Sequence, residues 1–186
     1  MKCRFFFGAV VLSLMTIVVV GCSQGPWETY ESPDGDFTIL FPGIPEVKTE
    51  TQQVGADQMV ITHYDVGQKY GVFGAKYGVV VVELQAANPE AVQFDDNAAL
   101  IGAKSGVRKE GGKIISEYDI TMAGYDGWEF EVETKTSEST LRMFRKDLTI
   151  YTFEVARRKG KDFSEETEKF FDSFQLVWEE EEYDDY

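Results

Sequence analysis

The chain has 186 residues, of which 43% are hydrophobic and 14% aromatic, so it can bury the core of one domain. Its formal net charge is −15 at pH 7, which argues against nucleic acid as a partner. With two Cys and one His, the composition also leaves little material for thiol chemistry or for a histidine-rich metal site.

The N-terminus has the pattern of a secretory signal. Lys2 and Arg4 form a short positive segment, and residues 5–20 follow without a charge. This run is short for a membrane span, which needs about 20 apolar residues. The apolar run ends at Gly21 and Cys22, where a polar chain begins.

Four residues at this point resemble the lipobox of bacterial lipoproteins: Val19, Val20, Gly21 and Cys22. The resemblance implies that Cys22 is acylated, that residues 1–21 are removed as a signal peptide, and that the bilayer is a partner through the lipid. Ser23 resembles the outer-membrane sorting signal if the cell is Gram-negative. The alternative is an uncleaved anchor helix with an incidental Cys. Either hypothesis places the domain in the cell envelope, outside the inner membrane.

After the predicted signal, we expect a polar tether over residues 22–31 and a single domain over residues 32–178. FTILFPGIP at residues 37–45 predicts a strand ended by prolines. Residues 47–54 and 59–66 predict a hairpin, and the run VVVVEL at residues 79–84 predicts a well-buried strand.

Two sets of helix-start residues, Asn88 to Glu90 and then Asp95 with Asp96, predict a first helix that ends near Gly106. Four runs with period-two character then predict an antiparallel meander: residues 113–121, 127–136, 140–146 and 148–157. A last helix is expected from Asp162 and Glu165, which have the spacing of a capping box.

Four aromatic residues recur at helical spacing in this last helix: Phe163, Phe170, Phe171 and Phe174. The stripe indicates a face that packs on the sheet, and an aromatic cofactor groove is the alternative. FQLVW at residues 174–178 predicts a final edge strand. Residues 179–186 contain six acidic side chains and predict a disordered, solvated tail; the alternative is a tail that docks on a basic partner or loosely collects divalent cations.

Chemistry-bearing residues are few. Cys3 lies in the predicted signal and Cys22 would carry lipid, so the mature domain has no thiol for a disulfide, a nucleophile or a metal. His63, in the strand pattern MVITHYDV, is typical of a half-buried or exposed strand residue. We therefore predict no catalytic, cofactor-binding or metal-ligating residue.

One polar constellation stands out. Glu129, Glu131 and Glu133 alternate with Trp128, Phe130 and Val132, which predicts a strand with one core face and one wet or ion-paired face. Several basic residues could lie opposite the glutamates: Lys135, Arg142, Arg145, Arg157 and Arg158. Cross-strand ion pairing is the favoured interpretation, and a ligand site is the alternative.

Four segments are similar to recurring parts of small bacterial lipoproteins with a PsbP-like fold, and also of DcrB-type envelope lipoproteins: FTILFPGIPEV, AGYDGWEFEVET, LRMFRKDLTIYTFEVA and FFDSFQL. The resemblance implies an α+β fold with a mostly antiparallel central sheet and packed helices, as an α/β/α sandwich. It implies no catalytic residues. Because the glutamate stripe fits poorly with a sheet covered on both faces, we expect part of the sheet to be open.

Two functions follow as hypotheses. The first is a non-catalytic envelope lipoprotein that binds or scaffolds an envelope protein or ligand. The second is a lipoprotein hydrolase that acts on glycans through a pair of carboxylates. Two carboxylates facing each other across a deep cleft would favour the hydrolase.

Overall fold

The computed structural model describes residues 26–67 and 74–177. The predicted signal peptide, Cys22, the whole of the predicted acidic tail and the first residues of the predicted tether lie outside this part of the chain. Within the described residues, no helix is both long enough and apolar enough to cross a membrane.

The described chain consists mainly of strands. The elements are, in order, β1 (Glu28–Glu31), β2 (Phe37–Phe41), β3 (Glu46–Val54), β4 (Asp57–Val66), β5 (Ala75–Gln85), a 3-10 turn (Pro89–Ala91), α1 (Asp96–Lys109), β6 (Lys113–Met122), β7 (Tyr125–Glu133), β8 (Ser137–Lys146), β9 (Thr149–Arg158), α2 (Ser164–Asp172) and β10 (Gln175–Leu176).

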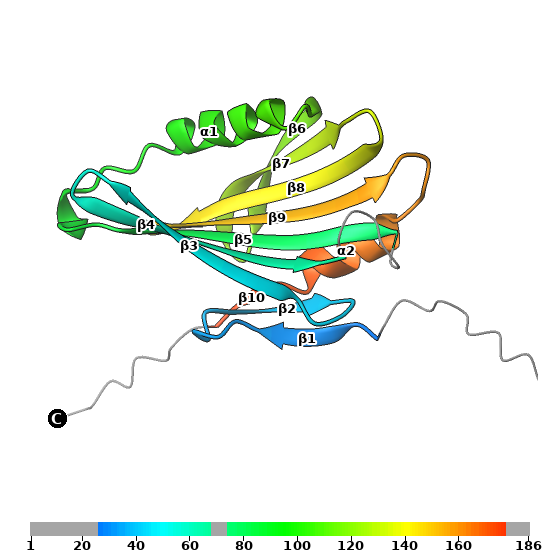
Figure 1. The fold of residues 1–186 in the computed structure, drawn as a ribbon, viewed down its shortest axis with the longest axis horizontal. Helices are drawn as coiled ribbons and strands as arrows, with labels where there is room; N and C mark the ends of the chain where they lie inside the picture. Colours follow the sequence, from blue (N-terminus) through cyan, green and yellow to red (C-terminus); the bar gives the residue numbers. More distant parts are fainter. Residues whose placement is uncertain (1–25, 68–73, 178–186) are drawn as a thin grey trace, which may run out of the picture.

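Seven strands form one antiparallel sheet in the order β3-β4-β5-β9-β8-β7-β6, with β9 at its centre. A smaller antiparallel sheet has the order β1-β2-β10. Helix α1 lies over one face of the large sheet, while α2 and the small sheet lie against the other (Figure 1). The predicted antiparallel architecture is confirmed, but the fold is dominated by its sheets rather than being a balanced α/β/α sandwich.

The turns follow from local sequence. Gly55, at φ 66°, closes the predicted β3–β4 hairpin, and Ala123 and Gly124 have the two positive φ angles (52° and 83°) of a tight turn between β6 and β7. The carboxylate of Asp95 caps α1 by accepting from Asn97 N at 2.9 Å. The helix continues past Gly106 to Lys109, because the left-handed turn that follows it falls at Gly111 (φ 79°).

Two predictions about element boundaries are corrected. Residues Glu28–Glu31, expected as part of a polar tether, form β1 and pair with β2, and the Tyr30 ring packs against the Phe41 ring with centroids 5.9 Å apart. At α2, Asp162 accepts from Ser164 N at 3.1 Å rather than completing a capping box with Glu165.

The main core lies between the large sheet, α2 and the small sheet. It contains buried aromatic rings from all three parts: Phe37, Phe41, Tyr64, Tyr77, Phe144, Tyr151, Phe153, Phe170, Phe171 and Phe174. The predicted role of the phenylalanine stripe as a sheet-packing face is confirmed for Phe170, Phe171 and Phe174. FQLVW supplies β10, which pairs with β2 in the small sheet.

The opposite face of the large sheet has a smaller core. Phe130, Val132 and Met143 are buried there, with Leu100, Ala103 and Val107 of α1 packed against them. No residue of α1 is itself buried. The predicted well-buried run VVVVEL is buried only at Val79, and Val80 to Val82 are half-buried. Val80 lines a hollow beside α1, whereas Val81 packs against the main core on the opposite face.

Candidate functional site

The glutamate stripe lies on the side of the large sheet that carries α2. Glu129, Glu131 and Glu133 alternate along β7 with Phe130 and Val132, which point toward α1 as the alternation predicts. Trp128 points the same way but is half-buried, and Glu129 is more buried than expected, with only 16% of its side chain exposed. The register is therefore correct, while the predicted contrast in exposure is too strong.

Arg142 explains why Glu129 can be buried. Its Nε donates to Glu129 Oε2 at 2.6 Å, and its Nη2 donates to Glu168 Oε2 of α2 at 3.2 Å. The guanidinium also lies over the Phe171 ring, 4.4 Å from the centroid. This contact set ties β7 and β8 to α2, so the arginine has a structural role.

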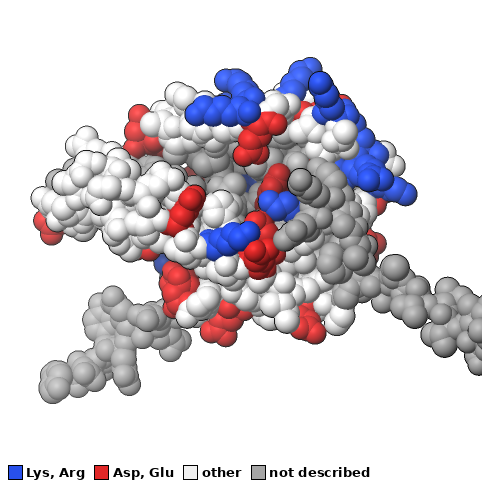
Figure 2. Space-filling view, in the orientation of Figure 1, with Lys and Arg blue, Asp and Glu red and all other residues white. Residues whose placement is uncertain are grey.

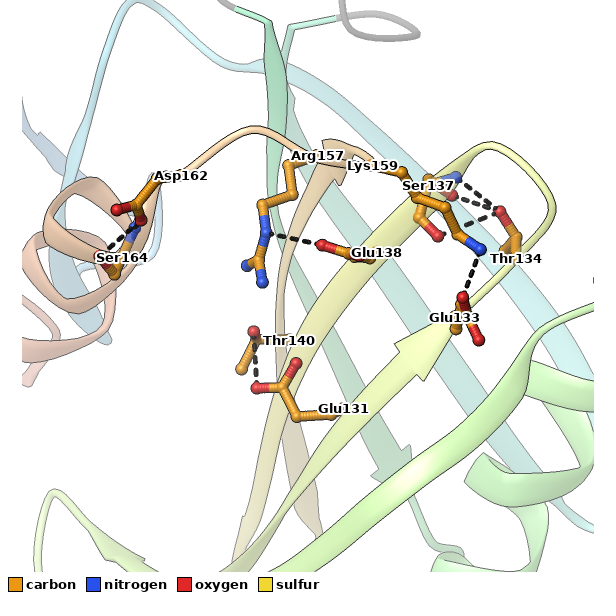
Figure 3. A network of polar contacts seen from close by, with 10 residues as sticks. All are labelled: Glu131, Glu133, Thr134, Ser137, Glu138, Thr140, Arg157, Lys159, Asp162 and Ser164. Carbon is orange, nitrogen blue, oxygen red and sulfur yellow. Dashed lines mark hydrogen bonds and ion pairs between the residues drawn. The ribbon is translucent and has the colours of Figure 1, made fainter.

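The other two glutamates also have partners in the fold (Figure 3). Thr140 Oγ1 donates to Glu131 Oε1 at 2.9 Å, and Lys159 pairs with Glu133. Burial raises the pKa of Glu131, although Thr140 and the charge of Arg157 oppose the rise. The hydrogen bond from Lys159 lowers the pKa of Glu133.

Of the five basic residues considered as partners, Arg142 contacts the stripe. Arg157 Nε instead lies 3.5 Å from Glu138 Oε2, across the β8–β9 pair. Arg145 lies on the other face, where it donates to Asp96 at 2.6 Å and 3.3 Å. Lys135 and Arg158 are exposed at the strand ends. The favoured interpretation, ion pairing within the fold, accounts for the stripe, with Lys159 as a partner that the sequence did not indicate.

The opposite shifts in pKa at Glu131 and Glu133 give a test of this description. We expect Glu131→Gln to raise the free energy of unfolding at pH 7. Burial raises the pKa of the Glu131 carboxyl in the folded protein, so the wild type loses stability as the pH rises from the ordinary pKa of a glutamate through this raised pKa. Gln cannot ionise and avoids that loss. The gain should shrink as pH falls below the ordinary range of a glutamate. Urea unfolding followed from about pH 8 to about pH 3 measures it.

Glu133→Gln is the matched control. It removes a carboxylate whose pKa is lowered, so it should reduce stability at pH 7, with the loss disappearing on acidification. Equal destabilisation by both substitutions at pH 7 would contradict the burial assigned to Glu131.

A mostly apolar hollow lies on the other face of the large sheet, beside α1. A groove of about 500 Å³ runs between α1 and the strands beneath it. We call it the α1 groove; its wall on the helix consists of Ala103, Gly106, Val107 and Glu110, and its floor includes Val80, Phe130, Val132, Leu141, Met143 and Ala156. The space-filling view shows the surface hollowed below α1 (Figure 2).

Small residues keep this groove open. A Cβ added at Gly106 would meet no atom within 4 Å, so the helix leaves free space at that position. Gly112 is different, because a Cβ there would lie 2.9 Å from Val107 and Val132, where the chain turns closely from α1 into β6. The groove was not predicted from the sequence; the signal for it is a helix whose sheet-facing positions carry Ala and Gly in place of large apolar residues.

A charged group borders the groove. Lys76 Nζ lies 2.9 Å from Asp65 Oδ1 and 3.5 Å from Glu154 Oε2. Burial lowers the pKa of Lys76, but the two carboxylates outweigh it and the pKa is raised overall. The lysine is therefore charged and stands between two acids that both contact it. A mostly apolar groove with one polar group at its edge can hold a ligand of mixed character.

A second, more polar hollow of about 710 Å³ lies beside the β6–β7 hairpin and the start of α1. Asp119, Asp126 and Trp128 line it, with Arg145 bound to Asp96. This ion pair lowers the pKa of Asp96. Because Arg145 and Asp96 in its lining already pair with each other, this polar hollow is a weaker candidate for a ligand site than the α1 groove.

The described residues hold no cluster of three or more His, Cys, Asp or Glu side chains that could bind a metal ion. His63 lies on β4 with its Nε2 3.9 Å from Glu50 Oε1, and its side chain is 37% exposed, as expected for a half-exposed strand residue. Cys22, the predicted lipidation site, lies outside the described residues.

The architecture defines a PsbP-like fold. The structure of cyanobacterial PsbP (CyanoP) from Synechocystis sp. PCC 6803 matches with a TM-score of 0.51 at 10% identity, covering 88% of this chain and 99% of that one. At this identity the match shows the fold alone. The resemblance stated from the sequence is confirmed to that extent.

Two further solved structures are less similar. The protein of unknown function PA94 from Pseudomonas aeruginosa has a TM-score of 0.35 at 8% identity, covering 73% of this chain and 85% of that one. A Bacteroides thetaiotaomicron VPI-5482 protein has a TM-score of 0.39 at 11% identity, covering 84% of this chain and 50% of that one. No family model and no curated protein sequence matches the chain.

Proposed function

We propose that this protein is a non-catalytic binding module, held in the cell envelope by an acylated Cys22, and that the α1 groove is its ligand site. The observation that carries the proposal is the open, mostly apolar space between α1 and the large sheet, where a packed core would otherwise lie. Its volume of about 500 Å³ falls within the usual range for ligand sites.

The lining of the groove favours a particular kind of ligand. Val80, Leu141 and Met143 offer apolar surface, while Lys76 supplies a charged group at the border. An elongated, mostly apolar molecule with one neutral polar end fits this lining, because three carboxylates (Asp65, Glu110 and Glu154) outnumber the one lysine and would repel an anion. The apolar part would displace water from the floor, and the polar end could hydrogen-bond near Lys76.

The hydrolase alternative has less support from this site. Asp65 and Glu154 both lie within ion-pair distance of Lys76 Nζ, so a lysine stands between the two carboxylates where the substrate of a glycosidase would have to bind. A glycosidase needs two carboxylates that flank the bond to be cleaved. Binding without turnover is the simpler function for this arrangement.

The envelope location is supported by the sequence. The charged N-terminus, the uncharged run and the lipobox-like residues at Cys22 resemble the signal of bacterial lipoproteins and support this location. The resemblance to PsbP-like lipoproteins implies helices packed on the sheet, and α1 and α2 lie on opposite faces of the large sheet here. Two or more acyl chains would make the attachment stable, whereas one would not.

Two glycines on α1 allow a matched test of the groove. Gly106 lines it and Gly102 does not, yet a Cβ at either position would meet open space. We expect Gly106→Leu to fill the groove and weaken binding of 1-dodecanol at least about tenfold, while Gly102→Leu leaves it unchanged. Native mass spectrometry of the purified protein, with melting curves for both variants, measures this.

Equal binding by the two variants, or no binding by the wild type, would contradict the groove as the ligand site. Turnover of esters or glycans that disappears on replacing Asp65 or Glu154 would favour the hydrolase instead.

Lipidation has its own test. Cys22→Ser should abolish incorporation of labelled palmitate and release the protein from the membrane fraction, since the thiol is the acceptor of the lipid. Wild type should have a mature chain that begins at Cys22. Continued labelling of the variant, or a mature protein that begins at Met1, would show that the anchor is not the lipid.

A further inference from the structure

One end of this acidic protein is basic. Three segments meet there: the end of α1 with the start of β6 (residues 108–113), the β7–β8 turn (133–138) and the end of β9 with the turn after it (157–162). Together they carry eight basic and four acidic residues, a net charge of +4 in a chain whose total is −15. Figure 2 shows Lys and Arg side chains gathered over α1 and the adjoining strand ends.

Backbone contacts hold the three segments together. Lys113 pairs with Glu133 in the β6–β7 ladder, and Ser137 pairs with Arg158 in the β8–β9 ladder. The backbone N–H of Lys159 donates to Thr136 O at 3.2 Å, which joins the two turns. The basic side chains therefore form one surface on rigid elements.

Six side chains make up what we call the basic end: Arg108, Lys109, Lys113, Lys135, Arg158 and Lys161. All six are exposed, and within the described residues none has a carboxylate within ion-pair distance. Three of the four acids nearby are already engaged, Glu133 by Lys159, Glu138 by Arg157 and Asp162 by Ser164, which leaves Glu110 as the exception. The positive charge of this surface is therefore not cancelled within the fold.

The N-terminal attachment, by which we mean the chain that joins Cys22 to β1, meets the domain at the same end of the molecule. The Trp27 ring packs edge-on against Tyr77, with centroids 5.2 Å apart, and Lys169 Nζ lies 4.8 Å from the Trp27 centroid. Tyr77 is two residues from Ala75, which pairs with Arg157 at the end of β9. β1 accordingly begins at the end of the sheet where β9 finishes (Figure 1).

The chain between Cys22 and Trp27 is short. Five residue steps separate them, and an extended chain of that length spans at most about 18 Å. A lipid on Cys22 would therefore keep this end of the domain close to the bilayer, near the range of about 8 Å over which charges interact at physiological salt.

We infer that the basic end docks on anionic phospholipid headgroups of the membrane that holds the Cys22 anchor, an inference that rests on the proposed lipidation. Each Lys or Arg held near an anionic surface strengthens binding roughly fivefold. The remainder of the protein is acidic and is repelled by the same surface, so docking also selects one orientation. The α1 groove, lined at this end by Thr134 and Ser137, would then open beside the headgroups.

The test compares acylated protein on two kinds of vesicle, one of phosphatidylcholine alone and one with phosphatidylglycerol. We expect acetylation of Lys113 and Lys135 to be several-fold slower on the anionic vesicles, with the protection lost in about 1 M salt, where the screening length is about 3 Å. Lys146, at the opposite end of β8 from Lys135, should react equally on both. Peptide mass spectrometry reads each lysine separately.

Charge reversal supplies the variants. Arg108→Glu together with Arg158→Glu should remove the protection of Lys113 and Lys135, whereas the control Lys146→Glu should retain it. Equal acetylation on both vesicles while the protein stays bound would overturn the docking but leave the anchor intact. Loss of the protein from phosphatidylcholine vesicles would overturn the anchor and the docking with it.

The acidic C-terminal segment is the other occupant that the test detects. Deletion of residues 179–186 separates the two occupants. If the deletion speeds acetylation of Lys113 and Lys135 to the same extent on both kinds of vesicle, then the tail covers the basic end and the membrane does not. The last described residues argue against this, because Leu176 pairs with Phe37, while the N-terminal attachment begins beside Phe41 at the other end of β2.

Discussion

Phe174 packs where the three parts of the main core meet. Phe174 follows the end of α2. The centroid of its ring lies 4.6 Å from that of Phe153, in the centre of the large sheet, and 5.7 Å from that of Phe37, in the small sheet. Such aromatic pairs contribute about 0.5–1.5 kcal/mol each beyond the area they bury. Without this cluster, the small sheet and α2 would have little to hold them on the large sheet, and the start of β1 would not be fixed near the N-terminal attachment.

The other face of the large sheet has a much smaller cluster. Phe130, Val132 and Met143 are buried beneath α1, but the helix itself buries no residue and leaves the groove beside it. The division is useful for binding, since one face supplies stability while the other keeps apolar surface available. The same rigid sheet also connects the groove to the basic end, because both include the strand ends of β7 and β8.

The elements that the sequence predicted best are those with a strong local pattern. The alternation of Trp128, Phe130 and Val132 with glutamates defined β7 and its faces, and the stripe Phe170, Phe171 and Phe174 defined the packing of α2. β1 was missed because ETYE has no apolar period and forms through pairing with β2. The partners of the stripe and the groove depend on register between distant strands and on space left beside small residues, which a single sequence does not encode locally.

One face of the large sheet holds the molecule together, while α1 is packed loosely over the other. Amide hydrogen exchange tests this difference directly, because opening free energies differ between weakly and strongly packed elements. Amides of α1 should exchange through an opening of clearly lower free energy than those of β5 and β9, whose aromatic residues form the main core. Protection of α1 equal to that of β9 would contradict the account.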